Sequence, residues 1–146
     1  NKRLIKRSKL YFLDTGLAVR LQGWSELMPL LNSPQIGSLF ETLVVAEIVK
    51  FIRNYNKNWE LFFWRTKEQE EVDLIIKTEQ GKVQAFEIKY AIHGISRSLA
   101  YPPAFQKVFA LKTPLVVVTA GGQPLTLSDQ CVTLPIALLH DYLQGL

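Results

Sequence analysis

The chain has 146 residues, of which 48% are hydrophobic and 21% charged, which suits the core of one globular domain. A single cysteine, Cys131, excludes an intrachain disulfide and a cysteine-rich zinc site. No apolar run approaches the roughly 20 residues of a membrane span, and no signal peptide is recognisable. We therefore expect one cytoplasmic domain, and the first residue, Asn1, indicates a fragment excised from a longer protein.

The net charge of +4 is concentrated at the start of the chain, where residues 1–20 carry most of the excess of basic side chains. The charged residues there are Lys2, Arg3, Lys6, Arg7, Lys9 and Arg20, with Asp14 as the acidic one. We predict that residues 1–10 form a basic arm. The arm can contact the phosphates of a nucleic acid, or it can be a solvated linker, and both interpretations stay open. Asp14 is expected to cap the segment that follows it.

The clearest helix is predicted from Pro34 to about Tyr55. Pro34 suits the first helical position after a Ser33 cap, and apolar side chains recur with helical spacing from Ile36 onward. A helix with a face this apolar is expected to pack on a sheet. Glu41 falls within this helix, and judged by its surroundings alone it is an exposed acidic side chain.

A strand and a hairpin are predicted next. Residues 58–64 form an aromatic strand that is expected to pair with the hairpin, with its rings in the core, although such rings can also stack on bases. Residues 74–76 and 85–88 form the hairpin strands. The loop 79–81 between them places Gly81 where left-handed backbone geometry is needed.

This loop fixes the register of the hairpin. If Thr78 pairs with Lys82, then Asp73 lies opposite Glu87 on one face, and Lys89 shares that face. Carboxylates that face each other across two strands repel. A divalent cation with oxygen ligands would offset the repulsion, and Lys89 could stabilise developing negative charge or orient a water. The alternative is that both carboxylates face solvent.

Beyond the hairpin the sequence predicts a broken helix, two buried strands and a closing helix. His93 is either an auxiliary base or phosphate contact, or an ordinary loop histidine. Gly121 and Gly122 belong to a turn without the features of a nucleotide-binding loop. Cys131 is expected in the core. The predicted elements are helices at 96–99 and 103–110, strands at 114–120 and 132–136, and a helix at 137–143.

Two sets of residues resemble a known family. Asp73 followed by Glu87-Ile88-Lys89 is similar to the core motif of the PD-(D/E)XK, or restriction-endonuclease-like, superfamily, although Val72 stands where the superfamily pattern has proline. The segments 9–17, 37–41, 63–66 and 71–73 resemble the C-terminal domain of unknown function found in many prokaryotic AAA+ ATPases. This similarity runs in order from residue 9 to about residue 135.

The resemblance implies an α/β fold with a restriction-endonuclease-like three-layer core, a mixed central sheet and helices on both faces. It implies that Asp73, Glu87 and Glu41 bind Mg²⁺ or Mn²⁺, and that Glu41, Asp73, Glu87 and Lys89 together form a catalytic site. The chain would then be a divalent-metal-dependent nuclease domain appended to an AAA+ ATPase. It would act on DNA rather than RNA, with the N-terminal ATPase domain as a partner and a homo-oligomer as an option.

Two alternatives remain on the sequence alone. The same fold can be a catalytically silent module that binds nucleic acid or protein for the ATPase. It can also be an oligomerisation cap, in which Glu41, Asp73, Glu87 and Lys89 have no role.

Overall fold

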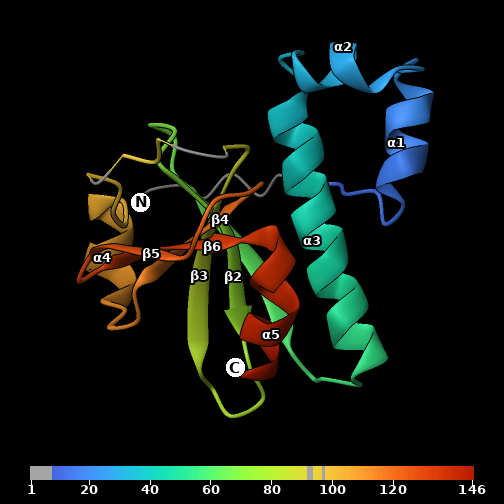
Figure 1. Ribbon diagram of the computed structural model, residues 1–146. Helices are drawn as coiled ribbons and strands as arrows, with labels where there is room; N and C mark the ends of the chain where they lie inside the picture. The colour runs from blue at the N-terminus through green and yellow to red at the C-terminus, as the bar shows by residue number, and fades with distance from the viewer. Residues whose placement is uncertain (1–7, 92–93, 97) are drawn as a thin grey trace.

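The computed structural model describes residues 8–91, 94–96 and 98–146. In these residues six strands form one mixed sheet in the order β1-β2-β3-β4-β6-β5, and helices pack on it (Figure 1). The strands are β1 (Glu60–Arg65), β2 (Glu71–Lys77), β3 (Val83–Lys89), β4 (Leu115–Thr119), β5 (Leu125–Ser128) and β6 (Cys131–Pro135). The helices are α1 (Thr15–Leu21), α2 (Leu27–Leu31), α3 (Ile36–Asn54), α4 (Pro103–Phe109) and α5 (Leu139–Gln144), with a 3₁₀ turn η1 (Ile136–Leu138).

Helices cover both faces of this sheet. On one face α3 and α5 pack on apolar side chains of β2, β3, β4 and β6. On the other face Phe105 of α4 packs on Ile75, Ala85 and Leu115. Figure 1 shows α4 on one side of the strands and α3 with α5 on the other. The predicted α/β architecture with a mixed sheet and helices on both faces is therefore confirmed.

The hairpin of β2 and β3 has the predicted register. Antiparallel pairs run from Leu74 with Phe86 to Lys77 with Val83, as the loop 79–81 requires. Gly81 has φ +78°, the left-handed geometry that favours glycine. The start of β2 and the end of β3 therefore meet at one end of the sheet.

The pairing of β2 with β1 contains an irregularity that the sequence did not reveal. The register shifts by one residue between Phe62 and Trp64, so Asp73 and Leu74 of β2 together lie opposite a single residue of β1. A bulge of this kind redirects side chains and interrupts their strict alternation. Asp73 and Leu74 consequently line the same hollow. Side chains of a strand normally alternate between its two faces, and on that basis Asp73 and Glu87 were predicted to share one face. The bulge interrupts this alternation at Asp73, so that prediction is wrong.

The buried strand β4 matches its prediction. All of its residues are buried, and it pairs in parallel with both β3 and β6, as expected of a continuous apolar run in the middle of a sheet. Cys131 of β6 is fully buried, as predicted. The edge strand β5 was not predicted, although Leu125 and Leu127 alternate with Thr126 and Ser128, and its residues are mostly exposed.

The start of α3 differs from its prediction. The helix begins at Ile36 rather than Pro34, and Gln35 precedes it as the N-cap without a side-chain hydrogen bond. The preceding residues form a turn closed by a hydrogen bond from the Ile36 N–H to the Ser33 carbonyl (3.3 Å), so Ser33 lies too early to cap the helix. Asp14, in contrast, caps α1 as predicted, since its carboxylate accepts a hydrogen bond from the Leu17 N–H (2.9 Å).

Three further predictions are corrected. The rings of Phe62 and Phe63 are 47% and 37% exposed rather than buried, because β1 is an edge strand of the sheet, while Trp59 just before it is buried. The helix predicted at 96–99 is absent from its described residues, where Ser96 and Ser98 bond to each other instead. The closing helix α5 begins at Leu139, since the turn η1 comes first. No helix in the described ranges is long and apolar enough to cross a membrane.

Candidate active site

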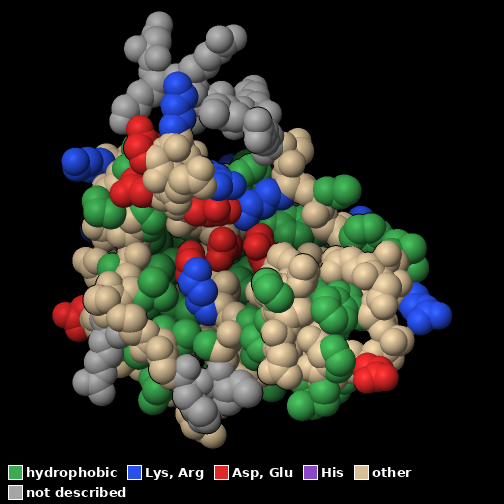
Figure 2. Space-filling view, turned by 90° about the horizontal axis from the view of Figure 1, so that it is seen from above, with side chains coloured by type: hydrophobic (Ala, Val, Ile, Leu, Met, Phe, Trp, Pro, Cys, Tyr) green, Lys and Arg blue, Asp and Glu red, His purple; other side chains and the backbone are tan. Residues whose placement is uncertain are grey.

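Charged side chains gather at the end of the sheet where β2 begins and β3 ends. They come from the segment 8–13, the first half of α3, and the two hairpin strands. Figure 2, a view onto this end, shows acidic and basic side chains in the middle of the face with hydrophobic side chains around them. Because sheet ends are where several elements meet, residues far apart in sequence converge here.

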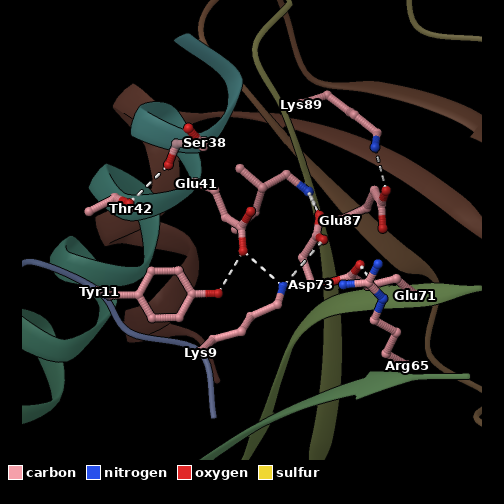
Figure 3. A network of polar contacts seen from close by, with 11 residues as sticks. Lys9, Tyr11, Ser38, Glu41, Thr42, Arg65, Glu71, Asp73, Glu87 and Lys89 are labelled. Carbon is pink, nitrogen blue, oxygen red and sulfur yellow. Dashed lines mark hydrogen bonds and ion pairs between the residues drawn. The ribbon is translucent and has the colours of Figure 1, made fainter. Parts of the chain in front are cut away.

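Lys9 lies at the centre of this group. Its ammonium nitrogen is 2.5 Å from Glu71 Oε1, 3.0 Å from Glu41 Oε1 and 4.0 Å from Asp73 Oδ1 (Figure 3). The nitrogen also lies 5.3 Å from the centre of the Phe63 ring. Burial opposes the charge on Lys9, but hydrogen bonds to Glu71 and Glu41 outweigh burial and raise its pKa. Lys9 is therefore a firmly protonated cation surrounded by three carboxylates.

Tyr11 holds Glu41 from the same segment. Its hydroxyl donates a 2.6 Å hydrogen bond to Glu41 Oε1, the oxygen that also receives Lys9. Burial, and then this bond to Glu41, raise the pKa of Tyr11, so the phenol is a neutral donor. Two side chains of one extended segment thus fix the position of the α3 glutamate.

Asp73 is the most perturbed acid of the group. Its Oδ2 accepts a 2.8 Å hydrogen bond from the backbone N–H of Ile88 on β3. Its side chain is only 14% exposed. Burial, and next the charge of Glu87, raise the pKa of Asp73 to about 6, against the opposing effect of the Ile88 hydrogen bond. A carboxyl group that titrates this close to neutrality is typical of functional sites.

Glu87 and Lys89 form a separate pair at the end of β3. Lys89 Nζ lies 2.6 Å from Glu87 Oε1, and the Lys89 side chain is 48% exposed. Phe86 and Ile88, on either side of Glu87, pack beneath α3. By alternation Glu87 leaves the strand on the α4 side, whereas Asp73 meets Lys9 in the hollow beside α3. Both acids stay near the same end of the hairpin, close enough for Glu87 to raise the pKa of Asp73.

The predicted metal ligands meet one requirement and miss another. Glu41 and Asp73 are oxygen donors that contact one cationic group, which is the donor chemistry that Mg²⁺ and Mn²⁺ prefer. Within the described residues, however, no three His, Cys, Asp or Glu side chains are grouped closely enough to hold a metal ion. The ammonium group of Lys9 lies between the carboxylates, and Glu87 pairs with Lys89. The donor atoms are of the kind that a divalent ion prefers, but as the described residues are placed they do not form a group that could hold one.

The structure adds three residues that the sequence did not assign to the site: Lys9, Tyr11 and Glu71. Glu71 could have been predicted, since it precedes Asp73 by two residues on one strand and such residues normally share a face. Lys9 and Tyr11 carried none beyond the family resemblance, because their partners lie 30 or more residues away. The predicted contributions of His93 and of the arm residues Lys2, Arg3, Lys6 and Arg7 fall outside the described residues.

A hollow of about 490 Å³ adjoins the charged group, between β1, α3 and the segment 8–13. Apolar side chains such as Val45 and Val49 line one wall, and Lys9 and Asp73 lie at its charged end. Arg53 also lines it. The charged group is therefore reachable from an open surface depression.

Comparison with known proteins places this chain among uncharacterised relatives. The model of a family described as Domain of unknown function (DUF4143) matches residues 36–139. The chain is 30% identical over 135 residues to uncharacterized proteins of Mycobacterium bovis and Mycobacterium tuberculosis. Each alignment covers 92% of this chain and 29% of the relative, so the chain spans less than a third of the length of these relatives. No solved structure matches the chain significantly.

Proposed function

The chain belongs to the DUF4143 family, and on that premise we propose that it is a divalent-metal-dependent nuclease domain of the PD-(D/E)XK, restriction-endonuclease-like superfamily. The proposal includes hydrolysis of phosphodiester bonds in DNA. It also includes attachment to an AAA+ ATPase domain, for which the greater length of the relatives leaves room. A cytoplasmic location fits such an activity.

One observation carries the proposal. Glu41 from α3 and Asp73 from β2 contact the same cationic group, at the end of the hairpin where β3 brings Glu87 and Lys89. These are four residues from three elements, and they include one carboxyl with a pKa of about 6. A hairpin that only stabilises a fold gains nothing from such a concentration of acids, because like charges on neighbouring strands repel.

The residues have distinct roles in this proposal. Glu41 and Asp73 would hold Mg²⁺ or Mn²⁺, with Glu87 completing the site after it leaves Lys89. The ion, when bound, would polarise a phosphate oxygen and favour ionisation of a water. Lys89, half exposed at the strand end, would stabilise the negative charge that develops on the phosphate. Arg65, which lies 3.6 Å from Glu71, would contact the flanking phosphates.

A second candidate function has its own supporting observation. Lys9 already neutralises Glu41, Glu71 and Asp73, and Lys89 is engaged by Glu87. A centre whose carboxylates are saturated by the chain's own lysines suits a catalytically silent module. Such a module would dock the ATPase onto nucleic acid or a protein through the exposed basic side chains.

Cleavage assays separate the two candidates. Single- and double-stranded DNA and RNA are incubated with Mg²⁺ or Mn²⁺ and the unmutated chain, Asp73→Asn, Lys89→Ala or the control Lys77→Ala, which removes an exposed lysine paired with Glu60. We expect cleavage by the unmutated chain and the control, and its loss in the other two. Retained binding without cleavage in all four proteins supports the silent module. Equal cleavage in all four rules out the assigned site.

A further inference from the structure

Helices α1 and α2 form a lobe whose apolar core is separate from the cores at the sheet. This small core joins Ala18 of α1 and Leu30 of α2 to Leu39 near the start of α3. Figure 1 shows α1 on the far side of α3 from the strands, with α2 beyond the start of α3. The lobe therefore presents its outer surface away from the rest of the described chain.

This lobe and the segment that leads into it expose much of the apolar surface of the described residues. Of the fourteen large hydrophobic side chains that are exposed there, half lie between residues 10 and 28: Leu10, Phe12, Leu13, Leu17, Leu21, Leu27 and Met28. Figure 2 shows hydrophobic side chains gathered over the lobe, in the right-hand part of the view, with charged side chains at its margin.

The size of this apolar surface is that of a protein interface. The exposed fractions of the seven residues run from 40% to 88%, which corresponds to roughly 800 Å² if a fully exposed residue of this kind presents on the order of 200 Å². The largest apolar patch of a monomeric protein is usually about 300–600 Å². One side of a standard interface between two proteins buries about 800 Å². The lobe thus offers the area that a stable dimer needs.

Three of the exposed side chains form a stripe along α1. Leu13, Leu17 and Leu21 follow one another at intervals of four residues, and this spacing places side chains on the same side of a helix. Ala18, on the opposite side, is buried in the core of the lobe. The stripe is therefore the outer face of α1.

The stripe is complementary to itself when a second copy of α1 packs antiparallel to it. If the two-fold axis passes at Leu17, then Leu13 of one copy lies beside Leu21 of the other. The same rotation brings Asp14 of one copy to the level of Arg20 of the other, and both side chains are exposed. A parallel pairing would instead place like charges at the same level. Charge complementarity therefore favours the antiparallel arrangement.

We propose that the chain forms a two-fold symmetric dimer in which α1 of one copy packs antiparallel on α1 of the other. The dimer is independent of the proposed function, because the stripe contains no residue of the charged group and suits a nuclease and a silent module alike. Leu13 ends the segment that carries Lys9 and Tyr11. The dimer therefore also restrains the segment that holds Glu41.

Sedimentation velocity at several chain concentrations measures the association, and circular dichroism checks the folding of each variant. The unmutated chain should dimerise. Leu17→Glu places two carboxylates together at the two-fold axis, so it should weaken association by about tenfold or more. Its charge lies in the first turn of α1, where a carboxylate favours a helix. Leu21→Lys, in the last turn, is the second variant and should also weaken association. Phe109→Glu on α4 is the matched control, because Phe109 is 47% exposed and Leu17 49%.

Cysteine cross-linking tests the antiparallel arrangement. Cys131 is fully buried and does not compete. Under mild oxidation, Leu17→Cys should form disulfide-linked dimers. Leu13→Cys and Leu21→Cys should cross-link to each other when mixed, and much less when each is alone. The control Phe109→Cys should not cross-link.

Three outcomes overturn the dimer. A chain that stays monomeric at every concentration overturns it and leaves the apolar face to another part of a longer protein. A dimer that Leu17→Glu and Leu21→Lys do not weaken, or that Phe109→Glu weakens equally, associates through another surface. Cross-linking of Leu13→Cys and of Leu21→Cys each with itself, without a mixed product, means that the helices are parallel and contradicts the two-fold axis at Leu17.

Discussion

The carboxylate of Asp73 accepts the backbone N–H of Ile88 across the hairpin at 2.8 Å. The Asp73 side chain, rather than a backbone carbonyl, thus accepts this strand N–H at the point where β2 has its bulge. The antiparallel pairing of the two strands ends at the next residue, Leu74, which lies opposite Phe86. This contact ties the acid to β3 and holds it in a part-buried place, where burial, and next the charge of Glu87, make its ionisation costly and raise its pKa.

Asp73→Asn should remove a pH dependence of stability. The folded pKa of Asp73 is about 6, above the value of about 3.9 for an unfolded aspartate, so its contribution is most favourable below pH 4 and is lost as pH rises through 6. Asparagine does not ionise, and its carbonyl oxygen can still accept the Ile88 N–H. Without divalent ions, the variant should be more stable than the unmutated chain at pH 7 by about 1–3 kcal/mol.

Urea unfolding from pH 4 to pH 7 measures this effect. The stability difference between Asp73→Asn and the unmutated chain should grow across that range. Asp129→Asn, a change at an exposed turn aspartate, is the matched control. A parallel pH profile for Asp73→Asn would show that Asp73 titrates as an ordinary aspartate.

Two glycine substitutions should have opposite signs. Gly81 has φ +78° in the hairpin loop, and a methyl group there meets no atom within 4 Å, so the cost of Gly81→Ala is backbone strain of about 1 kcal/mol. Gly37 lies in α3 with equal space and no positive φ, so Gly37→Ala should stabilise by about 0.5 kcal/mol. Denaturant unfolding of both variants checks the pair. A destabilised Gly37→Ala or an unaffected Gly81→Ala contradicts this account of the two positions.

The parts of the fold that were predictable rest on local signals. The register of the hairpin follows from Gly81 and two short strands, and α3 follows from apolar spacing along one segment. The edge position of β1 depends on the order of strands in the whole sheet. The exposure of Phe62 and Phe63 therefore could not be predicted from the residues around them. The exposed strand β5 has only four residues of alternating leucine and hydroxyl side chains, Leu125–Ser128, and its pairing with β6 is again a property of the whole sheet.

Three acids of the charged group were named from the sequence, whereas a fourth acid, Glu71, and the central cation, Lys9, were not. Glu41, Asp73 and Glu87 were named from the motif and its family resemblance. Lys9 was counted with a basic arm, since its contact with Glu41 spans 32 positions and no periodicity connects them. The bulge at Asp73 likewise depends on pairing with β1. Long-range contacts of this kind decide which charged side chains lie together, and the spacing of residues along the chain does not predict them.

Tyr11→Phe should lower stability through Glu41. The variant loses a 2.6 Å hydrogen bond from the phenol to a part-buried carboxylate, and bonds to charged groups contribute about 1.5–3 kcal/mol. Tyr55→Phe is the control, because the Tyr55 hydroxyl bonds to His140 on an exposed surface and should cost less. Urea unfolding gives both values. Equal losses for the two variants would mean that the Glu41 contact adds nothing beyond an exposed bond.

Neutralisation of the basic arm should weaken nucleic-acid binding uniformly across sequences. Changing Lys2, Arg3, Lys6 and Arg7 to glutamine removes up to four phosphate contacts, which reduces the slope of log affinity against log salt by up to about four. Fluorescence titrations with labelled DNA at several salt concentrations measure that slope. The matched control changes four exposed lysines elsewhere, Lys50, Lys77, Lys107 and Lys112, so that the net charge falls equally. If both variants lose the same slope, net charge alone drives binding; if neither does, the arm is a linker.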